Sequence, residues 1–166
     1  MNTNISYTYL SKRKYAEALQ PGETALNYYQ SIGQQYGLSI VEANLAEITF
    51  YLGRYAESRH YAESGLKRVE PWVRPYCLYV LGHLSRVEAD FEAAEKYCHD
   101  AIQSAQEIED PWAEAPARNG LGEVYRDAGR PEDALEAFQS ALDIWKRIDI
   151  QHEVEHTEQL ITSINS

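Results

Sequence analysis

Four copies of one 22-residue pattern run along the chain, and they align with each other without a gap. The copies are ISYTYLSKRKYAEALQPGETAL (5–26), LAEITFYLGRYAESRHYAESGL (45–66), LGHLSRVEADFEAAEKYCHDAI (81–102) and LGEVYRDAGRPEDALEAFQSAL (121–142). Corresponding positions recur after 40, 36 and 40 residues. A repeat of this period is typical of arrays in which each unit packs only against its neighbours, so it constrains the fold more than any other feature of the sequence.

Each copy has the features of two helices that cross at close range. It opens with an aliphatic residue followed by a small one, as in Leu121-Gly122, and a second small residue such as Ala134 lies further along. Small residues let two helix backbones approach, while large apolar residues one turn away fill the space on either side. Between the two small residues lies a turn, occupied in the four copies by Arg13, Gly53, Ala89 and Gly129.

The turns have residue types that end one helix and begin the next. In AGRPEDAL, Gly129 suits the left-handed position after a helix, and Pro131 suits the first position of the following helix. Asp90 is expected to cap the helix that follows it, and Asp110, before a proline, is expected to start the next helix pair.

These residues resemble the tetratricopeptide repeat (TPR) family, whose repeat pairs two antiparallel helices. The resemblance covers about nine tenths of the chain and is best in the fourth copy, which has Leu121, Gly122, Tyr125, Gly129, Ala134, Phe138 and Ala141 in place. The period is longer than the usual 34 residues of the family. Long-period arrays of this kind resemble those of bacterial signalling proteins and kinesin light chains, and we expect helices extended by about a turn with slightly longer loops between pairs.

The resemblance implies an all-α fold: a right-handed superhelical TPR solenoid of four antiparallel helix pairs plus a C-terminal capping helix. We expect a single domain over residues 1–166, with repeats at about 1–34, 39–72, 75–109 and 112–148 and a capping helix at 150–165. The chain begins close to the first copy, as expected for a segment of a longer array. Pro21 falls inside a predicted helix, so that helix is either kinked or restarts at Pro21.

HEVEH, at residues 152–156, matches the H-E-x-x-H signature of zinc proteases. On a helical wheel, Val154, Ile150 and Ile161 fall within an apolar arc of about 120°, together with Leu160 and Ile164. Both histidines lie outside this arc and are expected to face water. No strand-like run and no downstream third ligand accompany them, so the motif is interpreted as a coincidence and no metal site or cofactor is predicted.

Other catalytic interpretations find no support in the sequence. No nucleophile elbow, P-loop or G-x-G-x-x-G is present. Cys77 and Cys98 are the only cysteines and are expected to be buried thiols, with Cys98 in the place of Phe138. We therefore predict that the chain is not an enzyme.

The formal net charge of −11 bears on partners and location. It repels a phosphate backbone, and no stripe of Lys and Arg exists to overcome it, so nucleic acid is not an expected partner. No stretch has the roughly 20 apolar residues of a membrane span, and the N-terminus has no export signal. The expected location is the cytoplasm.

In the family, the first helix of each pair lines a concave groove that binds partners, which here places a candidate site on three helices. The predicted groove residues are Asn44, Glu47, Phe50, Tyr51, Tyr76, Tyr79, His83, Arg86, Asn119, Glu123 and Arg126. Aromatic residues and Arg dominate binding hot spots, although Tyr76 and Tyr79 can instead pack between repeats. The clamp of Lys, Asn and Arg with which TPR co-chaperones hold acidic tails is not expected, because Glu47 and Glu123 occupy clamp positions.

These observations predict a protein–protein interaction module or scaffold that binds a neutral or basic peptide or protein segment in its groove. The alternative is a ligand-sensing or self-associating TPR segment of a larger bacterial regulatory protein. Homo-oligomerisation stays open in both.

Overall fold

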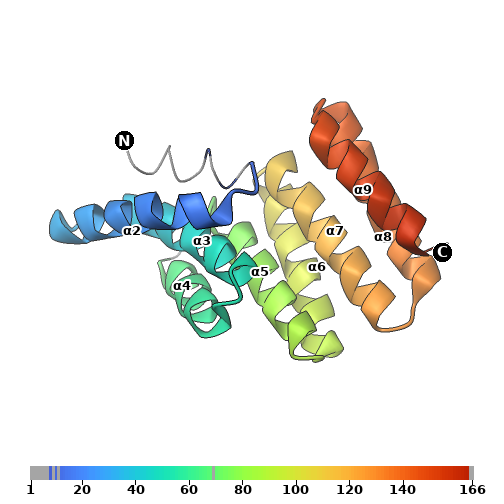
Figure 1. The fold of residues 1–166 in the computed structure, drawn as a ribbon, viewed down its shortest axis with the longest axis horizontal. Coiled ribbons are helices and arrows are strands. Elements are labelled where there is room, and N and C mark those ends of the chain that lie inside the picture. The colour runs from blue at the N-terminus through green and yellow to red at the C-terminus, as the bar shows by residue number, and fades with distance from the viewer. Residues whose placement is uncertain (1–7, 9, 11, 69, 165–166) are drawn as a thin grey trace. The chain divides into compact units, whose positions relative to one another are not determined.

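The computed structural model describes residues 8, 10, 12–68 and 70–164 (Figure 1). Over these residues it contains helices and no strand, which confirms the all-α class. The first helix of the first repeat was predicted on residues that lie mostly outside the described part. The helices are α2 (Tyr15–Ser31), α3 (Gln35–Tyr51), α4 (Tyr55–Lys67), α5 (Arg74–Val87), α6 (Phe91–Glu107), α7 (Pro111–Asp127), α8 (Pro131–Arg147) and α9 (Gln151–Ile164).

The chain divides into two compact units, Met1–Val80 and Leu81–Ser166, with the boundary inside α5. The first contains α2, α3, α4 and the beginning of α5; the second contains the rest of α5 and α6 to α9. We call them unit 1 and unit 2. None of the helices over the described ranges is long and apolar enough to cross a membrane.

Most connections between consecutive helices have the same length and the same backbone conformation. Helices α2, α3, α6, α7 and α8 are each 17 residues long, and three residues separate each of them from the next helix. After α3, for example, the amide of Gly53 donates to the Phe50 carbonyl and the amide of Arg54 donates to the Thr49 carbonyl. This pair of bonds is the Schellman motif, which satisfies carbonyls at the helix end.

The same motif connects α2 to α3 and α6 to α7, so the prediction of longer loops between pairs is wrong at these two connections. It is confirmed between α4 and α5, which six residues separate. Gly33, Glu109 and Asp149 have positive φ at connections between pairs, as Gly53 and Gly129 do within pairs. Two helices of 17 residues and two three-residue turns give the 40-residue repeat its length, and the excess over the usual period lies in the helices. Arg13 and Ala89 also have positive φ, so the predicted turn position is left-handed in all four copies.

Helix starts follow the predicted capping. One carboxylate oxygen of Asp90 accepts a hydrogen bond from the amide of Ala93 (3.1 Å). Asp110 accepts from the amide of Trp112 (3.0 Å), and Pro111 occupies the start of α7. These side chains satisfy amides that have no partner within the helix, which confirms both predicted caps.

The two helices of a pair meet at the small residues. A Cβ added to Gly122 would lie 2.5 Å from the Phe138 ring, and one added to Gly82 would lie 2.9 Å from the sulfur of Cys98. Cys98 is therefore the small core residue that the alignment with Phe138 predicts. In the second repeat the hydroxyl of Ser58 donates to the backbone carbonyl of Ala46 (2.7 Å), because a buried hydroxyl needs a partner.

Helix α2 runs through Pro21 without interruption, so the alternative in which a helix restarts at Pro21 is wrong. A proline inside a helix removes one backbone hydrogen bond and costs roughly 3 kcal/mol. Packing of Ala18 and Ala25 on α3 opposes this cost: Ala18 clusters with Ile48, and Ala25 clusters with Val41.

The 36-residue spacing comes from α4 and α5, which are 13 and 14 residues long. At the end of α4, Arg68 binds Glu42 of α3 with two nitrogens, at 2.6 and 2.9 Å, and also donates to Gln35. The hydroxyl of Ser64 donates to the same carboxylate. Because the Glu42 side chain is only 6% exposed, this ion pair is part of the interior of unit 1.

Candidate functional site

A cluster of tyrosines lies in unit 1, with Tyr51 and Tyr79 on the first helices α3 and α5 and Tyr15 at the start of α2, the second helix of the first pair. The rings of Tyr15 and Tyr51 are stacked, with centroids 4.3 Å apart, and the hydroxyls of Tyr51 and Tyr79 are 3.1 Å apart. Phe50 lies edge-on to Tyr51 at 5.2 Å. Tyr51 is nevertheless 40% exposed. The contacts hold its ring in place while part of it faces solvent, which suits a binding residue because little side-chain entropy is lost on binding.

The other predicted residues of unit 1 are less accessible than Tyr51. Asn44, Glu47, Tyr76 and Tyr79 are half-buried. Phe50 is only 8% exposed and packs against other rings, so its role here is structural. The groove position of Phe50 was carried over from the family resemblance, which does not account for rings contributed by neighbouring helices.

In unit 2, the predicted residues of α5 and α7 form a chain of ion pairs. Arg86 contacts Glu123 (3.6 Å) and donates to Asp127 (2.5 Å), and Arg126 lies 3.0 Å from the same Asp127. The positive charges of the two arginines and the negative charges of the two carboxylates therefore cancel. Repulsion of an acidic ligand by Glu123 is weaker than the sequence suggests, because the carboxylate is paired.

His83 lies next to this chain but inside the protein. It is 4% exposed, and its Nδ1 is 3.6 Å from a Glu123 oxygen. Burial and the nearby Arg86 lower the pKa of His83 to about 3, with Asp127 acting in the opposite direction. The imidazole is therefore neutral at physiological pH and is not positioned to contact a ligand directly.

Asn119 is also buried, at 8% exposure, because α9 covers it. Its amide donates to the hydroxyl of Thr157 on α9 (2.9 Å). The sequence predicted Asn119 as a groove residue, since the packing of a last helix against α7 is not visible in the repeat pattern. Its observed contact is structural.

The HEVEH segment begins α9. Val154 is buried with Trp145 and Ala115, and Ile150 and Ile161 pack against this cluster, as the helical wheel predicts. The His152 side chain is 63% exposed, whereas His156 is half-buried because it lies at the margin of the apolar arc. Over the described ranges, no group of three His, Cys, Asp or Glu residues is placed to hold a metal ion.

Both cysteines are free and buried, and burial raises the pKa of each thiol to about 12. A protonated thiol is a poor nucleophile. The neighbouring His99 instead contacts the hydroxyl of Tyr125 (3.2 Å), which donates to Glu95 (2.9 Å). Burial raises the pKa of that hydroxyl to about 12, and the bond to Glu95 adds to the effect.

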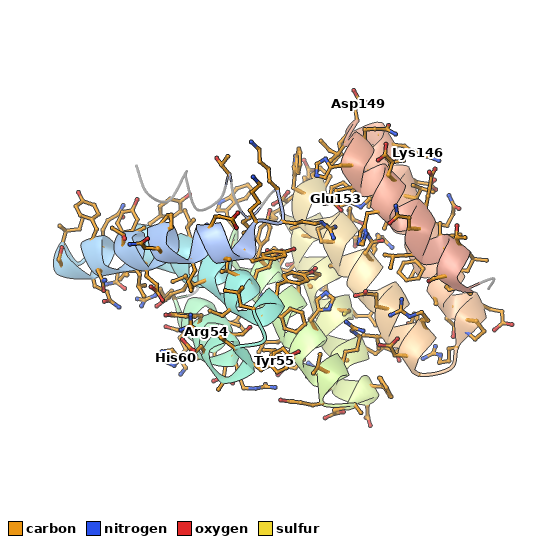
Figure 2. All side chains as sticks on the ribbon, in the orientation of Figure 1. Arg54, Tyr55, His60, Lys146, Asp149 and Glu153 are labelled. Carbon is orange, nitrogen blue, oxygen red and sulfur yellow. The ribbon has the colours of Figure 1, made fainter. Side chains whose placement is uncertain are left out.

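The aromatic residues at the turns of unit 1 were not identified from the sequence as candidate binding residues. Tyr15 and Tyr55 each open a helix directly after a basic residue, in RKY (13–15) and GRY (53–55). Tyr55 is 43% exposed and Leu52 is 36% exposed, and Figure 2 shows Arg54 and Tyr55 together where α4 begins. The shared turn position could have identified the two tyrosines, but the contact of Tyr15 with Tyr51 and that of Tyr55 with Phe50 required the structure.

Antiparallel helix pairs joined by repeated turns define the class, that of α-helical repeat proteins. A family model described as tetratricopeptide repeat matches residues 76–147, and this segment belongs to that family. Among solved structures, BtubC (BKLC) from P. vanneervenii has the same fold, with a TM-score of 0.68 and 18% identity over 96% of this chain and 68% of that chain. No curated protein matches the sequence.

Proposed function

We propose that the chain is a non-catalytic protein–protein interaction module that binds a peptide or protein segment along the first helices of its pairs. Tetratricopeptide repeats are generally protein-interaction modules, and repeat proteins bind partners over extended surfaces. The observation that carries the proposal is Tyr51, an exposed ring held by Tyr15 and Tyr79. Tyrosine fixed in this way supplies contact area at low entropic cost.

The expected partner segment is neutral or basic. Residues 81–166 contain nineteen Asp and Glu against seven Lys and Arg, so unit 2 produces a negative field. Such a field raises the association rate of a basic segment more than its final affinity. Arg86 and Arg126, paired with carboxylates, offer polar contacts to a neutral segment as well.

We also propose that the chain catalyses no reaction. The thiols, with a pKa of about 12, are protonated at neutral pH and are therefore poor nucleophiles. His83 is buried, and a pKa of about 3 makes it too weak a base for general-base work at neutral pH. A panel of peptide and ester substrates tests this part of the proposal. Hydrolysis of any of them, at a rate that a single substitution abolishes, would contradict it.

Tyr51→Ala tests the site by affinity capture followed by binding measurement. We expect a protein retained by the wild type to be lost by Tyr51→Ala, and we expect its purified binding segment to lose at least tenfold in Kd by calorimetry. Tyr28→Ala is the matched control, because Tyr28 is 59% exposed at the other end of α2. Equal affinities for the two variants would contradict a site at Tyr51.

A ligand-sensing or self-associating segment of a larger regulator is the second candidate. The observation that favours it is the uneven charge of the two units, since residues 1–80 contain eight Lys and Arg against seven Glu, unlike the acidic residues 81–166. Mass in solution separates this candidate from a monomeric adaptor.

A further inference from the structure

Two turns of unit 1 form a basic, aromatic surface, residues 12–15 and 51–55, which we call the basic edge. The Tyr15–Tyr51 stack joins the two turns. Tyr51, Leu52 and Tyr55 are each at least 36% exposed. Lys12 and Lys14 are exposed, and among the described residues neither has an ion pair or a side-chain hydrogen bond. The basic edge thus has an aromatic centre and a positive rim, the usual composition of an interface.

The corresponding turn of unit 2, residues 87–90, has the opposite charge, and we call it the acidic turn. Val87 is 45% exposed and is followed by the exposed Glu88 and Asp90. Ala89 has the same left-handed conformation (φ 61°) as Arg13 of the basic edge (φ 56°). Asp90 caps α6 through one oxygen, so its carboxylate is held in a fixed position. An apolar residue flanked by carboxylates complements a set of rings flanked by lysines.

From this complementarity we propose that the basic edge of one molecule docks onto the acidic turn of a second copy of the chain. Val87 would lie over Tyr51 and Leu52 of the other copy, and the carboxylates would face Lys12 and Lys14. The contact is heterologous, since it joins two different surfaces. Net charge does not prevent it, because at physiological salt only charges within about 8 Å interact strongly.

The strength expected of this association follows from its size. Two turns bury far less than the roughly 1,200 Å² of a stable interface, so the copies associate weakly and dissociate readily. Because exposed ion pairs contribute, the association weakens as salt is added. The inference deepens the second candidate function, self-association, and it shares Tyr51 with the proposed partner site. The two are distinguished because the charges of Lys12, Lys14, Glu88 and Asp90 control only the docking of a second copy.

Sedimentation equilibrium of the whole chain at high protein concentration tests the proposal. At an ionic strength of about 0.1 M, where a Debye length of about 10 Å screens the long-range repulsion between the acidic molecules but leaves close ion pairs largely intact, we expect a weight-average mass above the monomer mass of 19.0 kDa. At about 1 M we expect the monomer. A monomer in both conditions would overturn the proposal.

Exchanging the charges of the basic edge and the acidic turn tests whether these two surfaces are the ones in contact. One variant is Lys12→Glu with Lys14→Glu, and the other is Glu88→Lys with Asp90→Asn, in which Asn retains the helix cap. Each variant alone is expected to be monomeric, because like charges then face each other. An equimolar mixture is expected to regain a mass above the monomer, since the reversed edge meets the reversed turn. A mixture that stays monomeric overturns the assignment, and circular dichroism verifies that both variants are folded.

Lys67→Glu with Arg74→Glu is the matched control. It changes the net charge of unit 1 by the same amount, but Lys67 ends α4 and Arg74 begins α5, away from the basic edge. We expect this variant to associate like the wild type. A loss of association equal to that of the edge variant would show that net charge, and not the basic edge, controls the mass.

Discussion

His83 is a buried base whose charged form is disfavoured mainly by burial. Burial and Arg86 lower its pKa to about 3, while Asp127 acts in the opposite direction and Glu123 lies at 3.6 Å. In the unfolded chain the same group titrates near its ordinary value of about 6.5. Below that pH the unfolded state binds a proton that the folded state does not, so the free energy of unfolding falls as pH falls.

We predict that replacing His83 by Gln removes this pH dependence. Between pH 7 and pH 5, the wild type should lose about 2 kcal/mol more stability than His83→Gln, because each pH unit is worth about 1.4 kcal/mol. Urea unfolding at the two pH values measures the difference. His152→Gln, a change at a 63% exposed side chain, should leave the wild-type dependence intact. Identical pH dependence in His83→Gln and the wild type would contradict the assignment of a neutral, buried His83.

The left-handed turn positions allow a second prediction at the scale of one residue. Ala89 has φ 61°, a conformation that costs an L-residue with a Cβ roughly 1–2 kcal/mol. Ala89→Gly should therefore stabilise the protein by about 1 kcal/mol. Gly129→Ala should destabilise it by a similar amount through the backbone alone, since its added Cβ would meet nothing within 4 Å. Thermal melts of the two variants should shift in opposite directions; shifts of the same sign would rule out this explanation.

At the scale of the helix pair, Gly122 sets the distance between α7 and α8. Helix propensity favours Ala over Gly by about 1 kcal/mol, but the added Cβ would lie 2.5 Å from the buried ring of Phe138. We expect the clash to dominate, so that Gly122→Ala loses about 1–3 kcal/mol in denaturant unfolding. Adding Phe138→Leu should recover part of this loss. A stabilised Gly122→Ala would mean that the helices are farther apart than described.

Helices α3 and α4 are held together by a buried ion pair, in contrast to the close approach of α7 and α8 at a glycine. Arg68→Met would leave the Glu42 carboxylate without its charged partner in the interior, and we expect a loss of about 3 kcal/mol. Glu42→Leu combined with Arg68→Met removes both charges and should restore most of the stability. Equilibrium unfolding of the two variants provides the measurement, and a double variant no more stable than Arg68→Met would contradict a desolvation cost at Glu42.

Most helices could be predicted from sequence because their signals are local. Asp90 and Asp110 cap helices within three residues of themselves, and small residues such as Gly122 recur at fixed positions. The three-residue connections between pairs could not be predicted correctly. Glu109 and Asp149 take the left-handed conformation that Gly usually adopts, so the turn they form has no glycine to mark it.

At the scale of the whole molecule, the candidate site was only partly predictable. The repeat register places Tyr51 and Arg86 on the first helices, where Tyr51 is 40% exposed and Arg86 contacts Glu123. Burial of His83 depends on α7, and burial of Asn119 depends on α9. Each of these helices is distant in sequence from the residue that it covers. A pattern with a period of one repeat contains no information on such contacts.

The claim that partners bind at the tyrosine cluster is tested most directly by photo-crosslinking. A photoreactive phenylalanine analogue at Tyr51 should crosslink to a protein segment in native cell extract, and the same analogue at Tyr28 should not. A basic or neutral segment identified at Tyr51 alone is the result that this account predicts. Equal crosslinking at both positions, or crosslinking at Tyr28 alone, would contradict it.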